Sequence, residues 1–262
     1  MREQRRDLRD GEDEDEVPQQ LDRARPALLL ERLGGGGQVA LWTAAAAIDY
    51  AGPAWLTRER LRGLQRVAVA HFAERYSLFI IICLGESIVA IGVGASEERF
   101  DAQLVAGVGL GLLITVALWW TYFDRFAAVA EERLRTHGDP VLAAADAYSY
   151  LHLVLVAGII LFAVGVKLAI HDVGAPLHDA TRLALCGGVA LYLVGHVLFR
   201  LRIAGSVGVE KLVAAAALLV LYTAGADLAA WALAGAVTVV LGAMCAYETV
   251  SAHRAEPRRS TG

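Results

Sequence analysis

Long runs of apolar residues follow one another along most of this chain, and they restrict its fold more than any other feature. Residues 102–123 and 228–247 contain no Asp, Glu, Lys, Arg or His. A helix needs about 20 predominantly apolar residues to cross the hydrocarbon core of a bilayer. Charged residues make up 20% of the chain, against about 25% in a typical soluble domain. This is too little polar surface for a water-soluble protein of 262 residues, and it indicates a membrane protein.

Six of the runs are long enough to span a bilayer. Glu86 lies in one of them, and His152 and Lys167 lie in another. Backbone N–H and C=O groups in lipid have no water to bond to, so they must form hydrogen bonds within their own segment. Each run is therefore predicted to be a helix. We therefore predict an all-α, polytopic transmembrane bundle within residues 27–250, with six firm spans. The predicted spans are 76–95, 102–123, 147–170, 183–199, 208–226 and 228–250.

A seventh run, within residues 33–51, is less clear. It is uncharged from residue 33 to residue 48 but contains four consecutive glycines, Gly34–Gly37. Each glycine weakens a helix by about 1 kcal/mol relative to alanine. The sequence leaves three interpretations open for this run: a short span, a re-entrant segment or an interfacial helix.

Charge is concentrated at the N-terminal end of the chain. Residues 1–26 hold nine acidic and six basic residues and few apolar ones, which predicts a disordered tail. The net charge of the whole chain is −4, so no nucleic-acid partner is expected. The three cysteines (Cys83, Cys186 and Cys245) lie in apolar runs without CxxC spacing, which favours buried packing over a zinc site or disulfides.

The segments between the spans predict an orientation. Fourteen Lys and Arg residues lie on one set of alternate segments, which includes the C-terminal tail at 251–262. The other set holds two, Arg99 and Arg182. By the positive-inside rule, the first set and the C-terminus are cytoplasmic. A spanning helix at 33–51 would then place the N-terminal tail outside the cell, in conflict with its arginines.

Glu86 is the first candidate functional residue. An ionisable group near the middle of a bilayer costs at least about 2.5–3.5 kcal/mol on insertion scales, and such groups normally face a cavity or a counter-ion. Glu86 is therefore predicted to bind a proton or a cation. A protonated or paired structural acid is the alternative. At 100° per residue, Glu86 shares one helical stripe with His71 and Arg75.

Polar side chains also interrupt two other spans. His152 lies in 147–170, and Tyr192, His196 and Arg200 recur at i, i+4 and i+8 in the span that follows. If these residues converge with Glu86, they form a polar pathway or pocket for a small ion or solute. A satisfied hydrogen bond between helices is the alternative for His152.

A third group of polar residues lies at the predicted membrane boundary. His71, Glu74 and Arg75 precede the first firm span, where helix capping or contact with lipid headgroups is expected. Asp124 follows the aromatic segment 119–123, which is typical of an interfacial belt.

Other signals of chemistry are weak. Glu248 is predicted to be solvated at the end of the last span. HxxE alone provides too few ligands for a metal site, and the sequence shows no phosphate loop, GxSxG or HExxH motif. We therefore predict no catalytic residues, no metal and no cofactor, and we expect that the protein is not an enzyme.

Three segments resemble the bacterial low temperature requirement protein A family. They are HFAERYSLFIIICLGESIVAIG, ALWWTYFDR and LYLVGHVLFRLR, and the resemblance covers roughly residues 38–250. It implies a multi-pass protein of the bacterial cytoplasmic (inner) membrane, in a family named for a link with growth in the cold. The matching positions are His71, Glu74, Arg75, Gly85, Glu86, Ser87, Asp124, His196 and Arg200.

The chain departs from the family at its N-terminal side. Family members usually begin with several further helices, including a segment resembling ELFFDLVFV, which does not occur here. We therefore expect a C-terminal portion of a family member, produced by truncation or a misassigned start. This expectation also removes the conflict over the N-terminal tail.

Two functions are consistent with the sequence. The first is a secondary transporter or ion-conducting protein in which Glu86 is the coupling carboxylate. The second is a non-transporting membrane scaffold or stress-response protein in which Glu86 is paired inside a closed core. The lipid bilayer is the expected surrounding in both cases.

Overall fold

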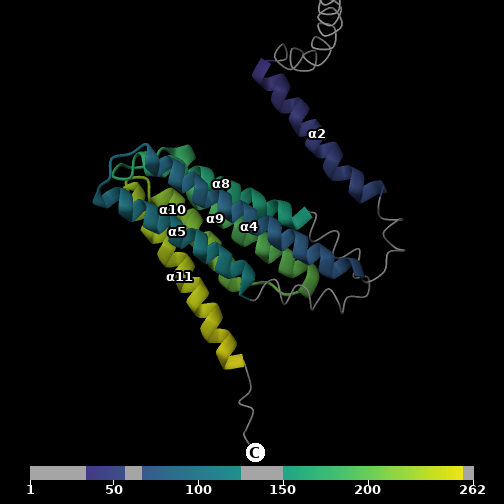
Figure 1. The fold of residues 1–262 in the computed structure, drawn as a ribbon. Helices are drawn as coiled ribbons and strands as arrows, with labels where there is room; N and C mark the ends of the chain where they lie inside the picture. Colours follow the sequence, from purple (N-terminus) through teal and green to yellow (C-terminus); the bar gives the residue numbers. More distant parts are fainter. Residues whose placement is uncertain (1–33, 57–66, 125–149, 256–262) are drawn as a thin grey trace, which may run out of the picture. The chain divides into compact units, whose positions relative to one another are not determined.

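A computed structural model describes residues 34–56, 67–124 and 150–255 (Figure 1). All seven regular elements in these ranges are helices, which confirms the predicted all-α fold. The chain divides into two compact units, residues 1–59 and residues 60–262. Each unit is described by itself. The predicted disordered tail, residues 1–26, lies outside the described residues.

The first unit contains one described helix, α2 (Gly34–Leu56). The glycines Gly34–Gly37 form its first turn and do not interrupt it, because a helix end tolerates glycine better than a helix interior. Within α2, the continuous apolar stretch runs from Val39 to Ile48, which is shorter than a full span. The described side chains from Val39 to Ile48 are all exposed within this unit.

The part of the second unit that the structure describes contains six helices, and each overlaps one of the six predicted spans, with ends that differ by up to nine residues. Five of them are long and apolar enough to cross a membrane. The sixth, α10, has 16 residues and a length of about 24 Å, somewhat below the roughly 30 Å of a hydrocarbon core. The helices are α4 (Val67–Ser96), α5 (Ala102–Phe123), α8 (His152–His171), α9 (Asp179–Ala204), α10 (Val209–Ala224) and α11 (Ala230–Ala255).

The six helices pack as a closed ring. Each contacts two neighbours, in the order α4, α8, α9, α10, α11, α5 and back to α4. A further contact between α5 and α8 crosses the inside of the ring. The inward side chains that are almost fully buried include Leu118, Ile159, Phe162, Leu193 and Leu241.

The antiparallel order of the helices gives the ring two different ends. One end, called the acidic end, holds the loops that carry Glu97, Glu98, Asp101, Asp172 and Asp227. At this end, Ala230 N–H donates to the Ala175 carbonyl at 2.9 Å and Trp231 N–H to the Val173 carbonyl at 3.1 Å. The opposite end, called the basic end, carries Arg75, Arg200, Arg202, Lys211 and Arg254.

Helices α8 and α9 approach each other closely enough for their backbones to touch. A Cβ atom added at Gly158 would lie 2.6 Å from the backbone N of Tyr192, and one added at Gly188 would lie 2.5 Å from the backbone N of Phe162. Such distances are below any ordinary van der Waals contact, so the two backbones touch through these glycines. Small residues allow this close approach in membrane helices. The contact fixes the position of α9 relative to α8.

Candidate functional site

Tyr122 and His152 form the centre of a buried polar cluster near the basic end of the ring. The Tyr122 hydroxyl lies 2.9 Å from Nε2 of His152, and both side chains are about 1% exposed. The tautomer of His152 decides which of the two groups donates. Buried polar groups in lipid need such partners, because no water replaces them. The hydrogen bond joins α5 to α8.

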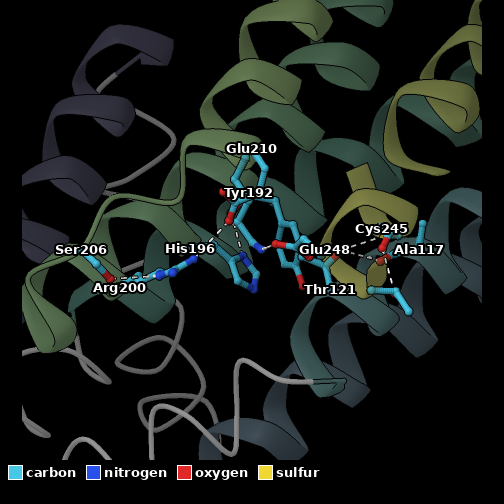
Figure 2. A network of polar contacts seen from close by, with 11 residues as sticks. Ala117, Thr121, Tyr192, His196, Arg200, Ser206, Glu210, Cys245 and Glu248 are labelled. Atoms are coloured by element: carbon cyan, nitrogen blue, oxygen red, sulfur yellow. Dashed lines mark hydrogen bonds and ion pairs between the residues drawn. The ribbon is translucent and has the colours of Figure 1, made fainter. Parts of the chain in front are cut away.

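His196 and Tyr192 of α9 extend the cluster. The Tyr192 hydroxyl donates to the Leu118 carbonyl of α5 at 2.8 Å, and Nδ1 of His196 lies 3.1 Å from the Tyr192 carbonyl (Figure 2). Because a carbonyl only accepts, Nδ1 of His196 carries the hydrogen. One turn of α9 therefore places a phenol and an imidazole inside the helix ring.

The phenol ring of Tyr122 packs against both imidazoles. Its ring centroid is 5.8 Å from that of His152 and 6.0 Å from that of His196, both in an edge-on arrangement. The Tyr192 ring stacks edge-on against His196 at 4.5 Å. Three helices thus bring four titratable side chains into contact: Tyr122 from α5, His152 from α8, and Tyr192 and His196 from α9. We call these four residues the Tyr–His cluster.

A partly buried ion pair joins two helices in the neighbouring part of the ring. Nζ of Lys211 on α10 donates to Oε1 of Glu248 on α11, and their side chains are 8% and 22% exposed. Beside it, the Thr121 hydroxyl of α5 lies 3.7 Å from Sγ of Cys245 on α11 (Figure 2). Taking two charges out of water costs several kcal/mol per ion, which their mutual attraction must offset. Glu248, which the sequence predicts to be solvated at the end of the last span, is half-buried and paired with Lys211.

Arg200 lies at the outer edge of this site. Its guanidinium donates to Oε1 of Glu210 at 3.1 Å and to the Ser206 hydroxyl at 3.1 Å (Figure 2). The Arg200 side chain is 43% exposed. It ties the end of α9 to the start of α10, across the turn that begins at Gly205 with a φ of 61°. The stripe predicted on α9 therefore changes from buried at Tyr192 and His196 to exposed at Arg200.

Glu86 lies on the exposed face of α4, away from the Tyr–His cluster. The α4 positions buried against the ring share one stripe: Ile80, Leu84, Ser87 and Ile91. At 100° per residue, Glu86 is about 130° around the helix from the middle of that stripe. Of the predicted convergent residues, the structure thus brings together His152, Tyr192 and His196, places Arg200 at their edge, and leaves Glu86 apart.

The predicted boundary residues lie at the basic end. Glu74 and Arg75 are exposed, as is Asp124, whose backbone N–H caps α5 by donating to the Trp120 carbonyl at 2.9 Å. His71 belongs to α4, but its side chain lies outside the described part of the structure. Within the described residues, no group of three His, Cys, Asp or Glu side chains is arranged to hold a metal ion.

Three residues of the site were missed by the sequence prediction. Tyr122 was assigned to the interfacial belt, but it is buried, whereas Trp119 and Trp120 of the same segment are each 44% exposed. The helical spacing offered a signal of this burial. Leu118 and Tyr122 follow Ile114 at i+4 and i+8, so the three residues share one face of α5. Lys211 and Glu248 are the other two, and their pairing depends on which faces α10 and α11 turn toward each other, which the sequence does not specify.

The comparison with protein families identifies the chain. The model of the bacterial low temperature requirement A protein (LtrA) matches residues 27–246. The chain belongs to this family. The match includes the three segments on which the resemblance was based, and it covers all six helices of the ring except the last turns of α11. Together with the apolar helices, it makes this chain a membrane protein.

One curated relative is longer than the stretch of it that this chain matches. An uncharacterized protein of Rhizobium meliloti (strain 1021) is 32% identical to this chain over 164 residues. The matched stretch is 60% of this chain and 40% of that protein, so the chain spans about two fifths of the relative's length. No solved structure matches the chain.

Proposed function

We propose that the protein is a secondary transporter or an ion-conducting protein, which moves a small ion or solute across the bacterial cytoplasmic membrane. One observation supports this most strongly: two histidines, two tyrosines and a lysine are buried in helices that are otherwise apolar, and the lysine is paired with the half-buried Glu248. Ionisable residues within membrane spans are costly, and they commonly mark ion pathways and proton relays. The proposal assigns the protein no catalytic reaction.

The position of the Tyr–His cluster is consistent with an ion-binding centre. Its members come from three different helices, so a change in the tilt of one helix changes the contacts between them. In many transporters, substrates and coupling ions bind between helices that move against each other. The basic end is the expected cytoplasmic side, because 14 of the 16 basic residues counted between and beside the predicted spans belong to one set of alternate segments, which includes Arg75 and Arg202 of the basic end.

The test is ion flux in liposomes that contain the full chain. Proton, Na⁺ and K⁺ movements are followed with ion-sensitive dyes under an imposed gradient. We expect His196→Asn to lower the flux at least about tenfold, because it removes a titratable group from the centre. His178→Asn is the matched control, because His178 is exposed at the acidic end. Unchanged flux in His196→Asn would contradict the proposed centre.

Glu86 remains a second candidate for the coupling group. Its carboxylate is the one acidic side chain in the apolar part of α4, which is the basis of the prediction from sequence. The same liposome assay with Glu86→Gln separates the two candidates. A loss of flux in Glu86→Gln with none in His196→Asn would assign the coupling role to Glu86. Unchanged flux in Glu86→Gln would exclude it from that role.

A non-transporting scaffold is the alternative function. It is supported by the hydrogen bond from Tyr192 to the Leu118 carbonyl, which fastens two helices without any need for an ion. For a scaffold, we expect that no tested ion crosses the liposome membrane, while His196→Asn still lowers the stability of the helix ring. Such a result would overturn the transport proposal.

A further inference from the structure

Three polar groups from three helices form a connected path at the basic end of the ring. Nε2 of His152 on α8 lies 2.9 Å from the hydroxyl of Tyr122 on α5. The same hydroxyl lies 3.5 Å from the Ser77 hydroxyl on α4. His152 and Tyr122 are almost fully buried, whereas Ser77 is half-buried. The path therefore leads from the buried centre of the site toward the surface.

Each group on this path can both donate and accept a hydrogen bond. A phenol and an aliphatic hydroxyl each have one O–H and two lone pairs, and a neutral imidazole has one N–H and one acceptor nitrogen. Such groups pass a proton along without carrying a charge for long. The Tyr122 O–H bond breaks as an N–H bond forms on His152, and Tyr122 takes a replacement proton from the Ser77 side.

The composition of the Tyr–His cluster favours a proton over a metal cation. Hard cations prefer several oxygen ligands, above all carboxylates and carbonyls. The carboxylate beside the cluster, Glu248, is already paired with Lys211, and the Leu118 carbonyl already accepts from Tyr192. The remaining groups are imidazoles and phenols. Imidazole is the side chain whose ordinary titration lies nearest to physiological pH.

Aromatic side chains from three helices contact His152. The ring of Tyr76 of α4 lies tilted against its imidazole at 5.0 Å, Tyr122 of α5 hydrogen-bonds to it, and Phe199 of α9 packs edge-on at 5.3 Å. The Tyr122 ring also lies edge-on to the imidazole of His196 on α9, at 6.0 Å. Tyr122 is therefore the group that connects the imidazole of His152 to the rest of the Tyr–His cluster.

We propose that the coupling ion of this protein is the proton, and that it reaches His152 from the basic end through Ser77 and Tyr122. This inference rests on the proposed transport function and specifies its ion and its path. Tyr122 and Ser77 act as positioned relay groups, and His152 is the group that holds the proton.

The experiment uses the full chain in liposomes that enclose a pH-sensitive dye. Protons are driven inward by a potassium diffusion potential, and Na⁺ entry is measured in parallel with radioactive Na⁺. We expect proton entry without Na⁺ entry. We also expect Tyr122→Phe to slow proton entry at least about tenfold, because it removes the hydroxyl and keeps the ring. Ser77→Ala is also expected to slow proton entry.

Each variant has a matched control. Tyr222→Phe also removes a phenol that makes one hydrogen bond, to Asp179 at 3.1 Å, but at the acidic end. Ser87→Ala removes a fully buried hydroxyl on the same helix as Ser77, where the hydroxyl bonds the Cys83 carbonyl of its own helix. Both controls are expected to stay within about twofold of the unmodified protein. Folding of every variant is checked by circular dichroism and gel filtration.

The outcomes separate the inference from the function on which it rests. Entry of Na⁺ without protons would overturn the proton as coupling ion and leave transport standing. Proton entry that is equally fast in Tyr122→Phe and Tyr222→Phe would overturn the path. If neither ion enters, the transport function fails, but the path can still be tested by nitrogen NMR of labelled histidine, which measures how fast His152 exchanges its proton with water. Equal exchange rates in Tyr122→Phe and in the unmodified protein would overturn the path.

Discussion

The Lys211–Glu248 pair is the residue-scale feature with the largest expected effect on stability. Removing one partner leaves a poorly solvated charge, so we expect Lys211→Met to lower the free energy of unfolding by about 2–4 kcal/mol. The double variant Lys211→Met/Glu248→Leu should recover most of this loss, because it replaces both charges with apolar contacts. Titration with sodium dodecyl sulfate in lipid bicelles, followed by circular dichroism, measures both values.

The Arg200–Glu210 pair provides the control for this prediction. The Arg200 side chain is 43% exposed, so Arg200→Met should cost less than about 1 kcal/mol. Equal losses for Lys211→Met and Arg200→Met would show that burial does not distinguish the two pairs. A double variant no more stable than Lys211→Met would show that the carboxylate of Glu248 has another stabilising partner.

The residue scale is also where the sequence predicted least. The i, i+4 spacing of Tyr192 and His196 was enough to place both on one face of α9, and the structure buries both. Position along a span did not determine the surroundings of Tyr122 or Glu248. Both lie near the end of an apolar run, where the sequence indicates the interface between membrane and water. Whether each side chain faces lipid, water or protein depends on which helix packs beside it.

At the scale of elements, the glycine contact between α8 and α9 leads to a further prediction. We expect Gly188→Ala to lower the free energy of unfolding by about 1–3 kcal/mol, because its Cβ would lie 2.5 Å from the Phe162 backbone and force the helices apart. Gly242→Ala on α11 is the matched control, because a Cβ there meets nothing within 4 Å. It should be neutral or gain up to about 1 kcal/mol in helix propensity.

The same bicelle titration compares the two glycine variants. Because Gly188 faces α8 beside Tyr192, its replacement should also weaken the hydrogen bonds of the Tyr–His cluster. Proton exchange at the labelled histidines provides this second measurement. A Gly188→Ala protein as stable as Gly242→Ala would mean that α8 and α9 separate at little cost.

Hydropathy predicted the helices well, because bilayer thickness fixes the length of an apolar run. It predicted their ends less well: α9 begins at Asp179 and ends at Ala204, beyond the predicted 183–199. The charged residues of these end turns, such as Arg182 and Arg200, reach loop or surface partners while the backbone stays helical. Hydropathy also could not orient α4 around its axis, because apolar residues surround the helix over residues 76–95, where Glu86 is the one charged residue.

At the scale of the molecule, the order of helices around the ring follows from contacts and not from any pattern in the sequence. α5 packs against α11 and α4, and α10 packs against α9 and α11. Short connections predict that neighbours in sequence are neighbours in space, which accounts for α9 beside α10 and α10 beside α11. The α5–α11 contact closes the ring between helices far apart in the chain, so it could not be predicted.

The separation of charge between the two ends leads to the last prediction, which concerns orientation. We expect the basic end and the C-terminus to lie in the cytoplasm, because basic segments are retained there during insertion. A cysteine introduced at Asp227, at the acidic end, should react in intact cells with a maleimide that cannot cross membranes. One introduced at Arg202 should react only after the cells are broken. Both positions are exposed on the described ring, so access depends on the side of the membrane. The reverse labelling pattern would invert the orientation, and it would place the path through Ser77 on the outer side of the membrane.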